Sequence, residues 1–417
     1  MNSRVGSTRW LNASGRAIVA SALLVFGSTA MAQTTEVVLG FSLPLTGGAA
    51  KEGNEARVGA EIAASYLASQ GGFKVGSQTV NFKVVFEDDK CNPQAATEAA
   101  NRLVTAGAKF VGGSFCSSAA LAQMPVFAAL KVPQIVYAYA DDLTGAARKQ
   151  AGADMSVRLG ANAAIEMAPL AKYAVLHEKH KKFFAMAQNT DFGRSMVKQF
   201  RKTAEQLGGS FVAEPEYFPF AATDYRTLLT KAKNSGADAI LAIGLAQETI
   251  GIMGQHKELG ISQPVFGSDL LGDASVMSAV GNTLPGAFGP WYYDDGTQPR
   301  EFPRTKAESG ATLMRTVVSA KTGKDPSRNH GLGWGTVMLL KQAMARSGSI
   351  EPKAVMQEVL SGHVFELPYG DYGFRPCGQA DMRAGVAGFT LKSRVLMTDR
   401  DYAGTAPVVL TSDDLCK

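Results

Sequence analysis

Residues 110–139 read FVGGSFCSSAALAQMPVFAALKVPQIVYAY. This stretch begins with an apolar strand pattern at residues 110–111, continues in a pattern that predicts a helix over 117–130, and returns to an apolar strand pattern at 133–137. A strand, a helix of about 10–15 residues and a second strand form a βαβ unit, whose two strands lie parallel in one sheet. The stretch therefore predicts an α/β fold.

The same alternation of strands and helices continues on both sides of this unit. Before it, strands are predicted at residues 37–41 and 80–86, and helices at 54–69 and 93–106. After it, helices are predicted over 161–173, 192–207, 225–234, 247–258, 304–322, 335–347 and 353–361, and strands over 183–187, 211–217, 239–243 and 265–267. These units suffice for two doubly wound lobes, each built on a parallel sheet.

Length and composition are those of an ordinary globular protein. The chain has 417 residues, of which 46% are hydrophobic and 19% are charged, so a disordered, collagen-like or coiled-coil chain is excluded. At about 100–200 residues per domain, we expect two or three domains.

The first 32 residues have the pattern of a secretory signal peptide. A short apolar run at residues 17–26 follows the basic residues Arg4, Arg9 and Arg16. Ala30-Met31-Ala32 then forms a cleavage site of small residues. The alternative, a membrane anchor, requires about 20 apolar residues, more than this run provides. Cleavage predicts a periplasmic protein, and it removes most of the basic excess, so nothing indicates a nucleic-acid partner.

Four cysteines remain after the predicted cleavage site: Cys91, Cys116, Cys377 and Cys416. An exported protein meets an oxidising environment, so disulfides are expected. Four cysteines allow three connectivities, and the spacing favours the two local pairs without deciding between the three. No C-x-x-C motif or nearby histidine pair is present, so no metal site is predicted.

Candidate catalytic and nucleotide-binding motifs do not fit their patterns. His177-Glu178-Lys179-His180 has its histidines at i,i+3, whereas the zinc-protease motif needs i,i+4. The glycine-rich stretch at residues 331–335 follows no predicted strand, and no G-x-S-x-G motif occurs. We therefore predict neither an enzyme nor a cofactor, and keep a secreted hydrolase only as an alternative.

Three turns at the carboxyl ends of predicted strands favour ligand capture, because ligands of open α/β sheets bind there. Ser117 and Ser118 begin a helix whose N-terminal N–H groups can receive a carboxylate. Tyr137 and Tyr139 end the next strand and can either stack on a ligand or pack. Asp269 follows a third strand and can hold an ammonium or amide, or simply cap the next turn.

Together these segments resemble the periplasmic leucine/isoleucine/valine-binding protein family, the extracytoplasmic receptors of ABC importers. The resemblance extends over about residues 37–392. The motifs that carry it, in chain order, lie at residues 46–53, 59–61, 88–93, 115–118, 141–144, 191–193 and 267–269.

The resemblance implies a type I periplasmic binding fold, with two α/β lobes joined by a three-segment hinge that close on a small molecule. The lobes would comprise residues 33–158 with 292–388, and residues 159–291 with 389–417. It also implies a Cys91–Cys116 disulfide, an ABC permease complex as partner, and a monomer.

The resemblance further implies roles for individual residues. Ser117 and the backbone near Phe115 would take the ligand carboxylate, with Ser118 beside them. Tyr139, with Tyr137, falls where the family supplies groups for the carboxylate and ammonium of the ligand. The remaining implied site residues are Phe192 as an aromatic wall, Leu245 or Ala246 on the wall of the other lobe, Asp269 as the partner of the ammonium, and Glu52 at the mouth of the cleft.

Four of these positions differ from the amino-acid-binding pattern. Tyr139 replaces a smaller hydroxyl residue, and Phe192 lacks a phenol oxygen. The wall near Leu245 lacks a tyrosine, and Glu52 is charged where an aromatic residue is usual. The predicted ligand is a small carboxylate such as an amino acid, and an aromatic acid, an amide or urea remain alternatives. A ligand-sensing domain of the same fold is also kept.

Overall fold

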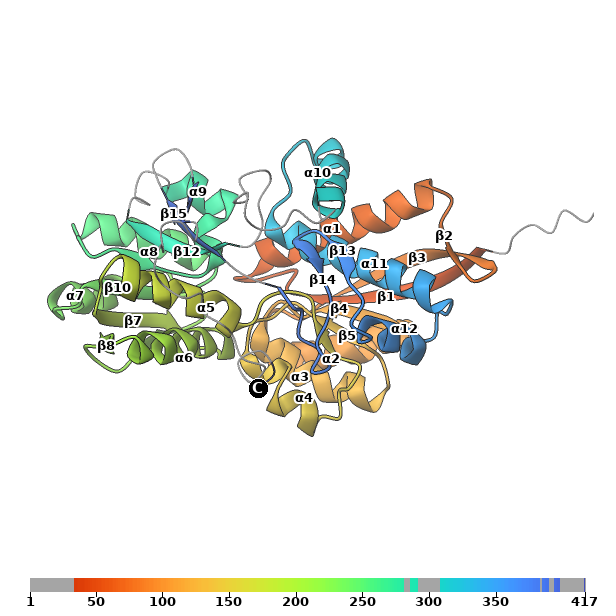
Figure 1. The fold of residues 1–417 in the computed structure, drawn as a ribbon, viewed down its shortest axis with the longest axis horizontal. Helices are drawn as coiled ribbons and strands as arrows, with labels where there is room; N and C mark the ends of the chain where they lie inside the picture. Colours follow the sequence, from red (N-terminus) through yellow and green to blue (C-terminus); the bar gives the residue numbers. More distant parts are fainter. Residues whose placement is uncertain are drawn as a thin grey trace, which may run out of the picture. The chain divides into compact units, whose positions relative to one another are not determined.

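The computed structural model of this chain describes residues 34–280, 286–291, 308–382, 385–389, 394–397 and 416 (Figure 1). The predicted signal peptide, residues 1–32, lies outside the described residues, as do the first four residues of the helix predicted over 304–322.

The first sheet has six strands in the order β2-β3-β1-β4-β5-β6. Its strands are β1 (Thr34–Leu43), β2 (Phe73–Val75), β3 (Gln78–Asp88), β4 (Phe110–Gly113), β5 (Gln134–Val136) and β6 (Val157–Arg158). All neighbours pair in parallel except β2, which runs antiparallel to β3. The helices between these strands are α1 (Ala50–Ser69), α2 (Pro93–Thr105), α3 (Ser117–Ala129) and the short α4 (Ala146–Gln150). The βαβ unit predicted from residues 110–139 is therefore confirmed as β4-α3-β5.

The second sheet has the order β16-β15-β12-β11-β10-β7-β8, with β9 also paired to β7. The strands are β7 (Lys182–Gln188), β8 (Ser210–Phe211), β9 (Glu216–Phe218), β10 (Ala239–Ile243), β11 (Val265–Phe266), β12 (Ala287–Trp291), β15 (Gly385–Phe389) and β16 (Arg394–Met397). The helices between them are α5 (Ala163–Lys172), α6 (Asp191–Gln206), α7 (Arg226–Asn234), α8 (Ala246–Glu258) and α9 (Ala274–Val280). The strand predicted over 211–217 is in fact the two short strands β8 and β9.

β15 belongs to the second sheet. This strand pairs antiparallel with β12, from Phe288 opposite Gly388 to Trp291 opposite Gly385. A passage of the chain from the first sheet to the second therefore precedes Gly385, whereas the boundary was expected at residue 388. Cys416 lies again beside the first sheet, because it is joined to Cys377, next to Gly378, whose carbonyl oxygen accepts the backbone N–H of Arg158 in β6.

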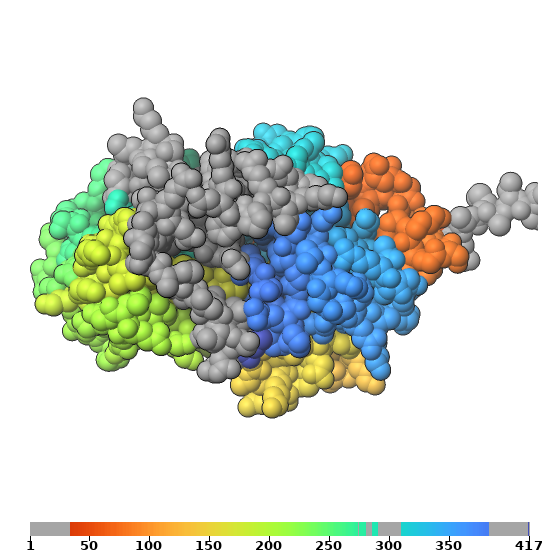
Figure 2. All heavy atoms as spheres, viewed as in Figure 1, coloured from red at the N-terminus to blue at the C-terminus, as the bar shows by residue number. Residues whose placement is uncertain are grey.

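A group of later elements packs on the first sheet (Figure 1). It comprises α10 (Glu308–Thr322), α11 (Arg328–Ser347), α12 (Pro352–Val359) and the hairpin β13 (Phe365–Leu367) with β14 (Gly370–Tyr372). In Figure 2 the blue C-terminal part lies beside the yellow segment that ends the first sheet, and the Tyr372 hydroxyl donates to the Leu159 carbonyl at 2.8 Å.

Glycines set the distance between α1 and α11. A Cβ atom on Gly333 would lie 1.8 Å from the Ala56 carbonyl oxygen, and one on Gly59 would lie 2.0 Å from the His330 carbonyl oxygen. The glycine-rich stretch at residues 331–335 is thus a helix–helix contact and not a nucleotide loop. Because glycine disfavours helices, the sequence predicted a start at residue 335, whereas packing extends α11 back to Arg328.

Both cysteine pairs favoured by spacing are present as disulfides. Cys91–Cys116 joins the loop after β3 to the start of α3 with a Cα–Cα distance of 5.3 Å, and Cys377–Cys416 has a distance of 5.6 Å. The first bridge holds together the loops at the carboxyl ends of β3 and β4, the two strands that flank β1 in the sheet. In the described part of the chain, no helix is long and apolar enough to cross a membrane.

Candidate functional site

Side chains from the carboxyl ends of the two sheets contact one another. Tyr139, which follows β5 of the first sheet, donates its hydroxyl to Asp269 Oδ2 at 3.3 Å. Its ring centroid lies 5.8 Å from that of Phe192, at the start of α6 in the second sheet. The structure thus brings together three residues that were predicted separately, at the place where ligands of α/β sheets bind.

The N-terminus of α3 is the first wall of this site. Ser117 is buried, and its hydroxyl accepts the backbone N–H of Ala140 at 3.2 Å, which ties the α3 start to the loop after β5. Ser118 donates to Asp191 Oδ2 at 2.6 Å and so links α3 to α6 of the second sheet. Phe115, just before the disulfide, is also buried. Helix N-terminal amides carry partial positive charge and favour an anion here.

The two tyrosines after β5 have different surroundings. Tyr137 has no exposed surface, its hydroxyl lies 2.6 Å from Thr336 Oγ1, and burial raises its pKa. The Tyr137 side chain therefore packs inside the protein, which was one of the two alternatives, the other being stacking on a ligand. Tyr139 is the tyrosine that faces the second sheet.

Arg158 holds the loop that carries Tyr139. Its guanidinium is fully buried and donates to the carbonyl oxygens of Tyr139, at 3.3 Å, and of Ala140. Burial lowers its pKa to about 10. Because these carbonyls are held, the peptide groups of the loop have fixed directions. The sequence offered no signal for this role, since Arg158 lies outside every motif.

Arg328 is the second residue that sequence reasoning missed. It begins α11, and its Nε lies 2.8 Å from Asp269 Oδ2, with side chains 12% and 4% exposed respectively. Its guanidinium carbon lies 5.0 Å from the centroid of the Tyr139 ring. The carboxylate of Asp269 is thus paired with a cation of the chain itself, the Arg328 guanidinium. The sequence did not indicate this role, because the helix was predicted to begin at residue 335, seven residues after Arg328.

A second contact between the sheets involves Glu52. This residue was expected at the mouth of a cleft, but it is fully buried near the start of α1. Its Oε1 accepts the backbone N–H of Ala246, the first residue of α8, at 3.2 Å. Burial raises its pKa.

The neighbouring acid Glu248 is buried beside this contact. It accepts the backbone N–H groups of Leu245, at 2.9 Å, and Ala221, at 2.8 Å, and the side-chain amide of Gln188 at 2.7 Å. Burial raises the pKa of Glu248. Leu245 and Ala246, at the α8 N-terminus, are both buried.

A third contact joins Lys51 to the second sheet. Its Nζ lies 3.1 Å from Asp273 and 2.9 Å from Glu55. Glu55 also receives hydrogen bonds from Ser327 and Asn329 at 2.7 and 2.8 Å. The N-termini of α1 and α11 therefore present both cations and acids to the loop after β11.

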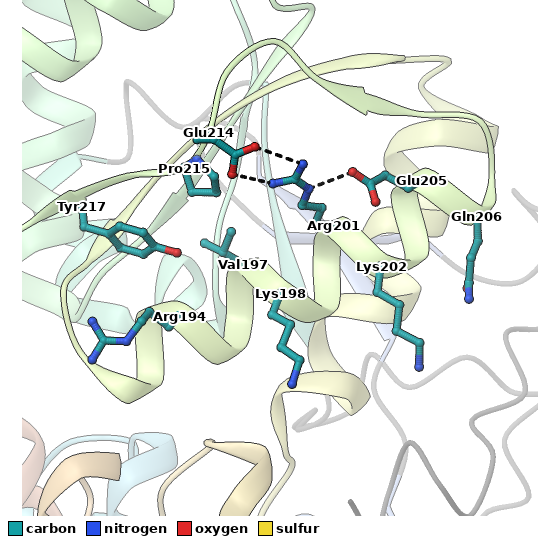
Figure 3. A pocket seen from close by; sticks show the side chains of 10 residues that line it. All are labelled: Arg194, Val197, Lys198, Arg201, Lys202, Glu205, Gln206, Glu214, Pro215 and Tyr217. Atoms are coloured by element: carbon teal, nitrogen blue, oxygen red, sulfur yellow. Dashed lines mark hydrogen bonds and ion pairs between the residues drawn. The ribbon is translucent and has the colours of Figure 1, made fainter.

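Two other kinds of site have less support. Among the residues that the structure describes, no group of three or more His, Cys, Asp or Glu could hold a metal ion. An open groove of about 820 Å³ lies along α6 and is lined mostly by charged side chains (Figure 3). Its Arg201 already pairs with Glu205 at 2.8 Å and with Glu214 at 3.0 Å. The groove is therefore a weaker candidate than the buried contacts between the sheets.

Two parallel sheets whose carboxyl ends meet through buried polar contacts define a two-lobed solute-binding protein. Comparison with known proteins agrees, because a model of the periplasmic binding protein family matches residues 36–392. The chain therefore belongs to the periplasmic binding protein family. It is of the ABC-transporter type. Proteins of this class are located outside the cytoplasm, bind small molecules and work with permease complexes, and they are not enzymes.

Individual relatives are similar over nearly their whole length. A leucine-, isoleucine-, valine-, threonine- and alanine-binding protein of Pseudomonas aeruginosa is 27% identical over 369 residues, which is 86% of this chain and 91% of the relative. A branched-chain amino acid transporter substrate-binding protein of Streptococcus pneumoniae, solved with isoleucine, has a TM-score of 0.75 at 21% identity and covers 87% of this chain and 99% of its own. A solute-binding protein of R. palustris, solved with benzoate, has a TM-score of 0.74 at 20% identity, covering 87% and 95%.

Proposed function

We propose that this protein captures a small carboxylate between the carboxyl ends of its two sheets and delivers it to an ABC permease. The observation that carries the proposal is the meeting of Tyr139 with Asp269 and Phe192, since it joins one sheet to the other at the ligand-binding edge. Because these side chains come from both sheets, a molecule bound between the sheets would contact both of them.

Each part of the site has a role in this proposal. The α3 N-terminus, with Ser117 and Ser118, receives the ligand carboxylate, because backbone amides and the helix dipole favour an anion there. The rings of Tyr139 and Phe192 contact the apolar part of the ligand. Leu245 and Ala246 complete the wall on the second sheet.

The required affinity is within reach of such a site. A micromolar dissociation constant corresponds to about 8 kcal/mol. Hydrogen bonds to a charged group contribute about 1.5–3 kcal/mol each. Two or three of them on a carboxylate, with burial of an apolar group against two aromatic rings, account for that value.

The relatives support a carboxylate without choosing its kind. The Pseudomonas relative is named for aliphatic amino acids, and the R. palustris structure holds benzoate. Both ligands carry a carboxylate, and only the amino acids carry an ammonium group. The same proposal includes export through a signal peptide at residues 1–32, a division into two lobes and a monomeric state.

Isothermal titration calorimetry tests this function. The protein without residues 1–32 is titrated with aliphatic amino acids and with benzoate-like acids, and we expect at least one carboxylate to bind at micromolar concentration. Tyr139→Ala should weaken binding at least tenfold, whereas Tyr217→Ala, a change at a tyrosine exposed in the α6 groove, should leave it unchanged. No binding to any carboxylate would contradict the proposal.

A further inference from the structure

Asp269 is the buried acid at the carboxyl end of β11, and its charge is already compensated within the chain. Arg328 Nε lies 2.8 Å from Asp269 Oδ2, and the Tyr139 hydroxyl donates to the same oxygen at 3.3 Å. The guanidinium also lies over the Tyr139 ring, 5.0 Å from its centroid. A cation, a carboxylate and an aromatic face thus form one cluster, in which Arg328 stands where a cationic ligand group would otherwise be placed.

We propose that the Arg328–Asp269 pair makes this receptor select carboxylic acids without an α-ammonium group over the corresponding amino acids. The inference rests on the proposed capture of a carboxylate and names the class of that ligand.

The physical reason is the cost of burying unpaired charge. An ammonium group that approached Asp269 would either share one carboxylate with Arg328 or displace the guanidinium. Sharing places two cations on one anion, and displacement leaves a guanidinium in a site where it is largely buried. Both outcomes are unfavourable, because a buried charge requires a partner of its own. An acid that lacks the amine avoids either cost.

The other acids near the cluster have cationic or amide partners as well. Asp273 and Glu55 share Lys51, at 3.1 and 2.9 Å, and Glu55 accepts two further hydrogen bonds. Glu52 accepts the Ala246 N–H, and burial raises its pKa, which disfavours its charged form. Nearby acids therefore do not replace Asp269 as a strong receptor for an ammonium group.

Matched ligands that differ only in the amine test the inference. Calorimetry compares leucine with 4-methylpentanoate and phenylalanine with 3-phenylpropanoate, at the same pH. We expect the acid without the amine to bind at least tenfold more tightly in whichever pair binds. Equal or tighter binding of the amino acid would overturn the inference and leave the proposed carboxylate receptor intact. No binding by any of the four would overturn the inference, and the receptor function would be contradicted as well only if benzoate-like acids also failed to bind.

Variants of Arg328 test the cause of the preference. Arg328→Met removes the guanidinium and should shift the ratio at least tenfold toward the amino acid, because Asp269 then lacks that cation. Arg328→Lys keeps a positive charge and should retain the wild-type preference. Arg346→Met, a change at a partly exposed arginine of the same helix, should leave the ratio unchanged. Thermal unfolding of each variant establishes that it folds. An unchanged ratio in a folded Arg328→Met variant would overturn the inference.

Discussion

Two buried acids cross between the sheets, and their partners differ. Asp269 reaches from the second sheet to a guanidinium, Arg328, at 2.8 Å. Glu52 reaches from the first sheet to a backbone N–H, that of Ala246, at 3.2 Å, and its Oε2 has no hydrogen-bond partner among the described residues. Asp269 is paired with a full positive charge, whereas Glu52 contacts the partial positive charge of a helix N-terminus.

The two contacts indicate that buried acidic residues serve two purposes in this protein, ligand selection and a pH-dependent contact. A guanidinium that balances a buried carboxylate repels a second cation, and under our proposal this disfavours a ligand with an ammonium group. A carboxylate held by one peptide group is poorly compensated, and burial raises its pKa. Such a group makes the contact between the sheets sensitive to pH. Both contacts depend on the helix pair, because α1 carries Glu52 and α11 carries Arg328.

The largest effect should follow from disturbing the helix pair that presents both groups. In Gly333→Ala, the new Cβ would lie 1.8 Å from the Ala56 carbonyl oxygen, so α1 and α11 must separate. We expect a loss of about 3 kcal/mol or more in the free energy of unfolding, measured by urea denaturation. Solute binding should weaken as well.

Gly254→Ala is the matched control, since Gly254 lies inside α8 with nothing within 4 Å of its added Cβ. This change should stabilise the protein by about 0.5–1 kcal/mol, the ordinary helix preference of alanine over glycine. If Gly333→Ala were as well tolerated as Gly254→Ala, close packing of α1 and α11 would not position the two contacts.

A smaller loss should follow from breaking the guanidinium pair alone. Arg328→Met should lower the free energy of unfolding by about 2–3 kcal/mol, somewhat less than for a fully buried pair because Arg328 is 12% exposed. Adding Asp269→Asn should recover part of this loss. A double-mutant cycle with zero coupling energy would show that the pair does not stabilise the protein.

The exposed pair Arg57–Glu61, at 2.9 Å on α1, provides the comparison for that cycle. Surface ion pairs contribute about 0–1 kcal/mol, so its coupling energy should be clearly smaller than that of Arg328 and Asp269.

The smallest effect should come from Glu52→Gln, and it should depend on pH. Because the pKa of Glu52 is raised in the folded state, folding takes up a proton, and the stability that it contributes is lost as pH rises through the folded pKa. The amide keeps the bond from Ala246 without the charge. We expect the variant to gain up to about 1 kcal/mol over wild type at pH 8 and nothing at about pH 4.

Urea denaturation at several pH values measures this difference. Glu61→Gln, at a partly exposed glutamate of the same helix, should show no such gain. A Glu52→Gln variant that lost stability at pH 8 would show that the charged form is favoured, contrary to the burial of this carboxyl group.

Much of the fold could be predicted from the sequence, because each βαβ unit is encoded by local apolar patterns. β1, α2, α3, β7 and β10 lie within a few residues of their predicted positions. The start of α11 was wrong, since glycines that weaken a helix locally are required by its packing against α1.

The site was predictable only in part. Ser118, Tyr139 and Asp269 follow strands, and that position indicated a ligand-facing role, whereas Phe192 was indicated only by the family resemblance. Arg158 and Arg328 have no such signal, because each acts through contacts with residues distant in the sequence, such as the Arg328–Asp269 pair. Tyr137 follows the same strand as Tyr139, yet its side chain packs against Thr336 of a helix that lies 199 residues later.

A crystal structure of the protein with a bound carboxylic acid tests the central claim most directly. We expect the ligand carboxylate at the α3 N-terminus and Arg328 still on Asp269, close to the 2.8 Å described above. A bound amino acid whose ammonium group lies on Asp269, with Arg328 displaced from it, would contradict the claim.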